Sequence, residues 1–137
     1  MTDTVLTPAE AQTLRTAAHG TVHLMVAANP GPVSSTKSGM ATGKAMTTAT
    51  GLVGRILAEK MKDLDLGGKN TADITDHVGG TITSTISTLL AKVPEEVDNF
   101  RRTLDLIIDS AVNSHSGGPK PAVAEMARKL REVIHAA

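Results

Sequence analysis

Two histidines one helical turn apart are the first chemically suggestive feature of this chain of 137 residues. His19 and His23 stand in the segment HGTVH, within an apolar pattern typical of a helix. At about 100° per residue, their side chains point within about 40° of each other, so both imidazoles could bind one metal ion. Glycine follows His19, so the pair lacks the glutamate base of H-E-x-x-H metalloproteases.

Two further candidate metal ligands, Asp73 and His77, stand one helical turn apart in the segment DITDH. If the two helices pack with these flanks together, His19, His23, Asp73 and His77 form a nitrogen and oxygen site for zinc or another divalent ion. Alternatively, Asp73 stabilises a helix N-terminus, and the histidines lie at the surface or in an interface. We favour this second interpretation, because histidines at this spacing occur often by chance.

Motifs for nucleophilic or phosphate chemistry are incomplete. In SGMATGKAMTT, three residues separate Gly39 from Gly43 and alanine follows Lys44, whereas a phosphate-binding loop needs four residues there and a hydroxyl after the lysine. Ser114 and His115 are adjacent, and adjacent side chains do not face each other as nucleophile and base must. The chain contains no cysteine, which excludes thiolate chemistry. We therefore expect a protein without catalytic activity.

The charge balance limits the classes of partner. The chain has fourteen Lys and Arg residues and fourteen Asp and Glu residues, so its formal net charge does not attract it to nucleic acid or to an anionic membrane. The longest stretch without these residues, 16–36, contains NPGP, which cannot continue a spanning helix. The N-terminus lacks the basic and apolar regions of a secretory signal, so we predict a cytoplasmic protein whose partner is itself or another protein.

The first helix has clear start and stop signals. Thr7 is suited to be the N-cap, Pro8 to be the first helical residue, and Glu10 to complete a capping box. The predicted helix ends near Ala28, before the NPGP segment. Its apolar stripe comprises Ala11, Leu14, Ala18, Val22 and Met25.

Four more helical patterns follow along the chain. Residues 29–50 form either a mobile loop or a weak helix, because they are rich in small and hydroxyl residues. Helices are predicted over about 51–64, from Asn70 or Thr71 onward, from Pro94 onward, and over 121–134. The pattern that begins at Asn70 or Thr71 contains Gly79, Gly80 and the strand-like TITSTIST, but its i, i+4 row favours a helix. That row comprises Ile74, Val78, Ile82, Ile86 and Leu90.

The helix that begins at Pro94 carries alternating charges. Asp98 with Arg102 and Arg101 with Asp105 are oppositely charged at a spacing of four, as on an ordinary exposed helix face. Its predicted inner face comprises Val97, Phe100, Leu104, Ile107 and Ala111. These carboxylates alone do not make a metal site, because di-metal bundles use a Glu-x-x-His repeat.

Together these patterns predict one all-α domain, an antiparallel bundle of four to five helices over residues 1–137. With a single aromatic residue the core is thin, and thin cores are often completed by a partner. We therefore expect a non-catalytic protein that acts by self-association or by binding another protein. Besides the metal site, a further alternative is a small-molecule-binding bundle lined by Met25, Met40, Met46 and Met61.

Overall fold

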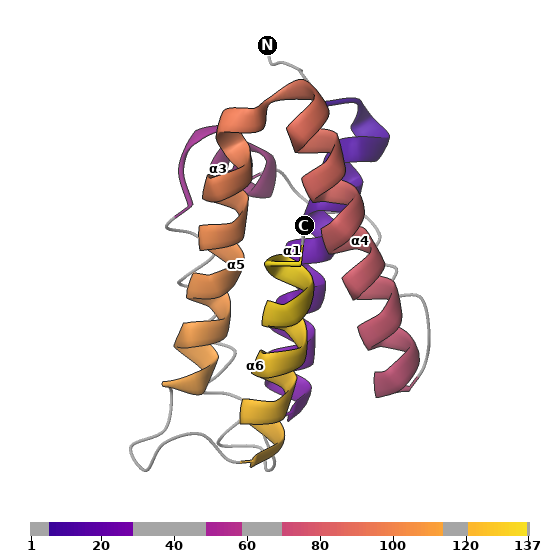
Figure 1. The fold of residues 1–137 in the computed structure, drawn as a ribbon, viewed down its shortest axis with the longest axis vertical. Coiled ribbons are helices and arrows are strands. Elements are labelled where there is room, and N and C mark those ends of the chain that lie inside the picture. Colours follow the sequence, from indigo (N-terminus) through magenta and orange to yellow (C-terminus); the bar gives the residue numbers. More distant parts are fainter. Residues whose placement is uncertain (1–5, 29–48, 59–69, 114–120, 137) are drawn as a thin grey trace.

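The computed structural model describes residues 6–28, 49–58, 70–113 and 121–136 (Figure 1). All regular structure in these ranges is helical, which confirms the all-α class. The elements are α1 (Pro8–Ala28), α3 (Gly51–Ala58), α4 (Thr71–Lys92), the 3₁₀ turn η1 (Pro94–Glu96), α5 (Val97–Val112) and α6 (Pro121–Ile134). The prediction for residues 29–48 and the predicted helical residues 59–64 lie outside the described ranges.

Side chains cap two of the predicted helix starts: at the first they are the pair that the sequence indicated, and at α4 the cap is Asn70, one of its two candidate start residues. The Thr7 amide donates to Glu10 Oε1 at 2.9 Å, and the Glu10 amide donates to Thr7 Oγ1 at 3.1 Å, which completes the capping box. At the start of α4, the Asp73 amide donates to Asn70 Oδ1 at 2.8 Å. Amide groups without an intrahelical partner thus receive an acceptor at both starts.

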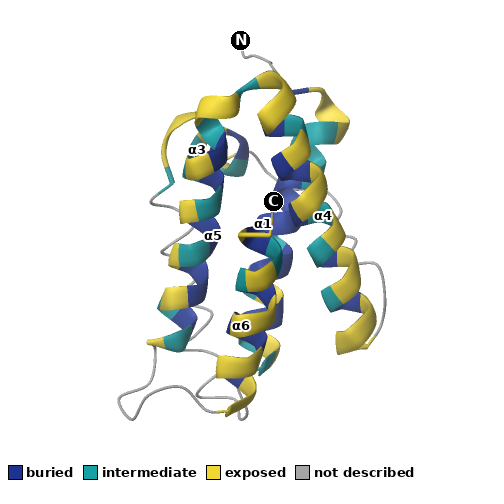
Figure 2. Ribbon diagram, in the orientation of Figure 1, coloured by how far each residue is buried: buried dark blue, intermediate teal, exposed yellow. Residues whose placement is uncertain are grey.

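Helix α1 is the central element of the fold. It contacts α3, α4, α5 and α6, and Figures 1 and 2 show it behind α6, with buried residues along its length. The sequence predicts one apolar stripe, whereas the buried set is wider because neighbouring helices cover several faces. It comprises Leu14, Arg15, Thr16, Ala17, Ala18, Gly20, Thr21, Leu24 and Met25.

Helix α4 is continuous through its two glycines and its threonine-rich segment, as the i, i+4 row predicts. Threonine hydroxyls bond within the helix: Thr75 Oγ1 donates to the Thr71 carbonyl at 2.6 Å. The prediction that Leu90 faces the core is wrong, since its exposed fraction is 51% and Leu89 is buried instead. A row at spacing four turns by about 40° at each step and so leaves the core after several steps.

Helices α1 and α4 approach closely at a glycine. A β-carbon built on Gly20 would lie 2.5 Å from Val78 Cγ2, so the side chain of Val78 occupies the space that a larger residue at position 20 would need. Lys92 Nζ lies 2.5 Å from Glu10 Oε1, which places the end of α4 beside the beginning of α1. Close packing through glycine compensates for the low aromatic content of the core.

The inner faces of α5 and α6 hold most of the remaining core. All five residues predicted to face inward on α5 are buried, including Phe100, the chain's one aromatic residue. On α6 the buried residues are Val123, Met126, Ala127, Leu130 and Ile134. Gly79 also faces α6: a β-carbon built there would lie 3.7 Å from Val133 Cγ2, an ordinary van der Waals distance.

Candidate functional site

The four predicted metal ligands lie on α1 and α4 with different environments. His19 is half-buried, whereas His23, Asp73 and His77 are exposed. The Asp73 carboxylate accepts a hydrogen bond from Asn70 Nδ2 at 3.2 Å, within the N-terminal turn of α4. Asp73 therefore has the local role that the alternative interpretation assigns to it.

The structure provides no metal-binding geometry for these residues. Within the described ranges, which include all four, no three histidine, aspartate or glutamate side chains group in a way that could hold a metal ion. Binding of zinc or another divalent ion by His19, His23, Asp73 and His77 stays a prediction from spacing alone.

The environment of His19 affects its protonation. Burial lowers the pKa of His19, and the positive charge of Arg15, one helical turn earlier, lowers this pKa further. Both effects disfavour the imidazolium form, so the neutral ring is favoured near neutral pH.

The predicted methionine-lined interior is only partly covered by the described residues. Met25 is fully buried on α1, while Met40, Met46 and Met61 lie outside the described ranges. Small-molecule binding at such a lining stays a prediction.

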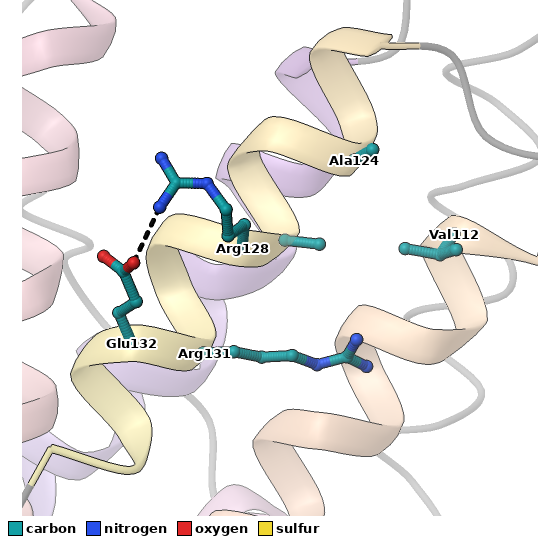
Figure 3. A pocket seen from close by; sticks show the side chains of 6 residues that line it. Val112, Ala124, Arg128, Arg131 and Glu132 are labelled. Carbon is teal, nitrogen blue, oxygen red and sulfur yellow. Dashed lines mark hydrogen bonds and ion pairs between the residues drawn. The ribbon is translucent and has the colours of Figure 1, made fainter.

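An open groove lies between α5 and α6 in the described part of the structure. It has a volume of about 520 Å³, and its lining comprises Val112, Ala124, Ala127, Arg128, Arg131 and Glu132. Figure 3 shows Val112 pointing from α5 toward α6, and Arg131 reaching from α6 toward α5. Packed helices stand about 8–10 Å apart, and the short alanine side chains opposite Val112 leave part of that space open.

Polar contacts join α5 and α6 near the C-terminal end of α6. Arg101 Nε donates to the Ile134 carbonyl at 3.1 Å, and His135 Nε2 lies 2.9 Å from Asp105 Oδ2. Arg131 forms an ion pair with Asp109, and its Nε lies 3.7 Å from Asp105 Oδ1. These contacts hold α5 and α6 together near the end of α6.

Charges of both signs stand on the exposed side of α6 next to the groove. Arg128 Nη1 lies 2.6 Å from Glu132 Oε2, and Arg128 also binds both carboxylate oxygens of Glu125. The hydrogen bond from Arg128 lowers the pKa of Glu125. The Arg128 and Glu132 side chains are 54% and 66% exposed, so both remain accessible to a partner.

Sequence reasoning missed this groove and part of the polar contacts between α5 and α6. The charge pattern predicts a pair of Asp105 with Arg101 along α5, whereas the contacts of the Asp105 carboxylate run to His135 and Arg131, next to and on α6. The available signal is the pair Ala124 and Ala127, small residues beside and within the apolar stripe of a strongly amphipathic helix.

Comparison with protein-family models, with curated proteins and with solved structures finds no match to this chain. Among the helices that the structure describes, none is both long and apolar enough to span a bilayer.

Proposed function

We propose that this chain is a non-catalytic helical protein that acts by self-association, with the groove between α5 and α6 at the interface. The observation that carries the proposal is this open apolar hollow beside exposed charges of both signs on α6. Such a hollow can receive apolar side chains of a second copy, while the charges fix the orientation. The cytoplasmic location expected from the sequence belongs to the same proposal.

The proposed protomer is an antiparallel bundle of α1, α4, α5 and α6. Two contacts support opposite directions for the first two helices: Glu10 of α1 binds Lys92 of α4, and Gly20 of α1 lies against Val78. A single bundle of this kind presents α6 and the groove on its outer surface.

Charge favours a second copy as the occupant. The formal net charge is +0, so two copies approach without net repulsion. Arg128 and Glu132 stand one helical turn apart on the same side of α6. If two α6 helices meet about a two-fold axis midway between these residues, Arg128 faces Glu132 of the partner subunit and Glu132 faces the partner's Arg128. This arrangement is self-complementary, as a two-fold interface requires.

Charge reversal tests the proposal by sedimentation equilibrium over a range of protein concentrations. We expect the wild-type chain to dimerise, and Arg128→Glu or Glu132→Arg alone to weaken the dimer because like charges then meet. An equimolar mixture of the two variants should form a heterodimer, because every pair across the interface is then opposite in sign. The double variant Arg128→Glu/Glu132→Arg should associate as the wild type does.

The matched control is Lys129→Glu, an equal charge reversal on the neighbouring face of α6. It should leave the dimer intact. A wild-type chain that stays monomeric at all concentrations would overturn self-association. Single variants that dimerise as strongly as the wild type would exclude this face as the interface.

A further inference from the structure

The short helix α3 is held at both ends by polar side chains from other elements. It has eight residues and contacts α1, η1 and α5, and Figure 1 shows it beside the α5 end that follows η1. Its own buried residues are Val53 and Ile56. With two buried side chains among its described residues, α3 depends on these outside contacts for its helical state.

A carboxylate and an amide hold the N-terminus of α3. Glu96 Oε1 accepts from the Val53 amide at 3.3 Å, and Asn99 Nδ2 donates to the Thr50 carbonyl at 2.7 Å. Asn99 Nδ2 also donates to Glu96 Oε1 at 3.0 Å, which orients the carboxylate. Gly51 has a φ of 68°, and a β-carbon there would lie 3.0 Å from Glu96 Oε2. Glycine at this position permits both the turn into α3 and the close approach of Glu96.

A buried guanidinium holds the C-terminal half of α3. Arg15 is only 9% exposed, and its Nε donates to the Ile56 carbonyl at 3.0 Å. Its Nη1 donates to Gln12 Oε1 at 3.2 Å, which fixes the side chain on α1. A negative charge at the N-terminus and a positive charge near the C-terminus both complement the helix dipole.

Burial of Arg15 reduces the net free energy by which its contacts stabilise the docked position of α3. A guanidinium loses hydration when it is buried, and it regains this hydration if α3 moves away. The regained hydration offsets part of the hydrogen bonding and apolar contact that opening would lose. Undocking of α3 from an otherwise folded chain would therefore require much less free energy than unfolding of the whole chain.

We infer that α3 opens and closes as a unit while α1, α4, α5 and α6 stay folded, and that Arg15 and Glu96 set this equilibrium. Opening exposes Val53 and Ile56, together with the surface of α1 and α5 that they cover. Opening of α3 does not depend on self-association, because α3 and the groove between α5 and α6 lie in different parts of the molecule.

Amide hydrogen exchange of the full chain, followed by NMR, tests the inference at residues 54–58. In the wild type these amides should exchange faster than the most protected amides of α5. In Glu96→Gln they should exchange about tenfold faster still, because a hydrogen bond to a charged group has been weakened. Arg15→Gln should act in the same direction. Because both bonds exist only when α3 is closed, the amides of α5 that exchange by global unfolding lose the same protection, but exchange at residues 54–58 should keep a much smaller urea dependence than exchange in α5.

Arg101→Gln is the matched control, because Arg101 makes an equivalent bond to the Ile134 carbonyl of α6. It should leave exchange in α3 unchanged. If Arg15→Gln destabilises the whole chain, Glu96→Gln still decides the result. Equal protection of α3 and α5 in the wild type, an equal urea dependence of exchange in the two helices, or unchanged exchange at residues 54–58 in Glu96→Gln would overturn the inference.

Discussion

Two arginines make nearly the same contact at two helix ends, yet they hold very different elements. Arg15 Nε donates to the Ile56 carbonyl of α3 at 3.0 Å, and Arg101 Nε donates to the Ile134 carbonyl of α6 at 3.1 Å. Helix α6 buries five residues, and ion pairs also tie it to α5. Helix α3 buries two. We therefore expect loss of this hydrogen bond to undock α3, whereas α6 should stay docked without it.

The largest effect is expected for Arg15→Ala. This change removes the donor to the Ile56 carbonyl and leaves a cavity beneath α3, which should lower the free energy of unfolding by about 2 kcal/mol. Urea denaturation measures the loss, and circular dichroism should show reduced helix content in the folded baseline. An unchanged midpoint would mean that the buried charge costs as much as its contacts contribute.

A smaller effect is expected for Arg101→Ala. Ile134 is buried, but His135 and Ala136, which follow it, are exposed, so water can reach its carbonyl once the Arg101 side chain is removed, and the free energy of unfolding should fall by about 1 kcal/mol. Helix content should stay at the wild-type level, because the five buried residues keep α6 in place. A loss of helix signal equal to that of Arg15→Ala would mean that α6 depends on Arg101 as much as α3 depends on Arg15.

The smallest effect concerns His19, which stands one turn after Arg15. Since the folded state lowers its pKa, the unfolded chain binds the proton more readily, and protonation favours unfolding. The resulting loss of stability is absent above the ordinary pKa of about 6.5 and grows as the pH falls below it. His19→Gln should reduce the decline in melting temperature between about pH 7 and pH 5. A decline as steep as in the wild type would contradict the assigned origin.

Local signals in the sequence predicted the fold well where one element determines its own structure. The capping box at Thr7 and Glu10 and the N-cap at Asn70 use contacts within four residues, so they can be read from the chain. The inward face of α5 follows from one period of apolar residues. Each of these features is independent of how the helices are placed.

Features that depend on packing between elements could not be predicted in the same way. Arg15 lies beside the predicted stripe of α1, and its burial follows from the position of α3. The groove depends on which residues of α6 stand opposite Val112, and Asp105 reaches across to His135 at a separation of 30 positions. No single-helix pattern contains this information, because it arises from the register of α5 against α6.

The contact between Gly20 and Val78 has a consequence for sequence change in this protein. A β-carbon at position 20 has no room unless the side chain at position 78 becomes smaller or moves. Substitutions at the two positions are therefore coupled, and the order in which they arise matters: shortening Val78 first opens space, whereas enlarging Gly20 first forces α1 and α4 apart. Divergent descendants of this chain should carry compensating changes at positions 20 and 78, so that the combined volume of the two side chains is preserved.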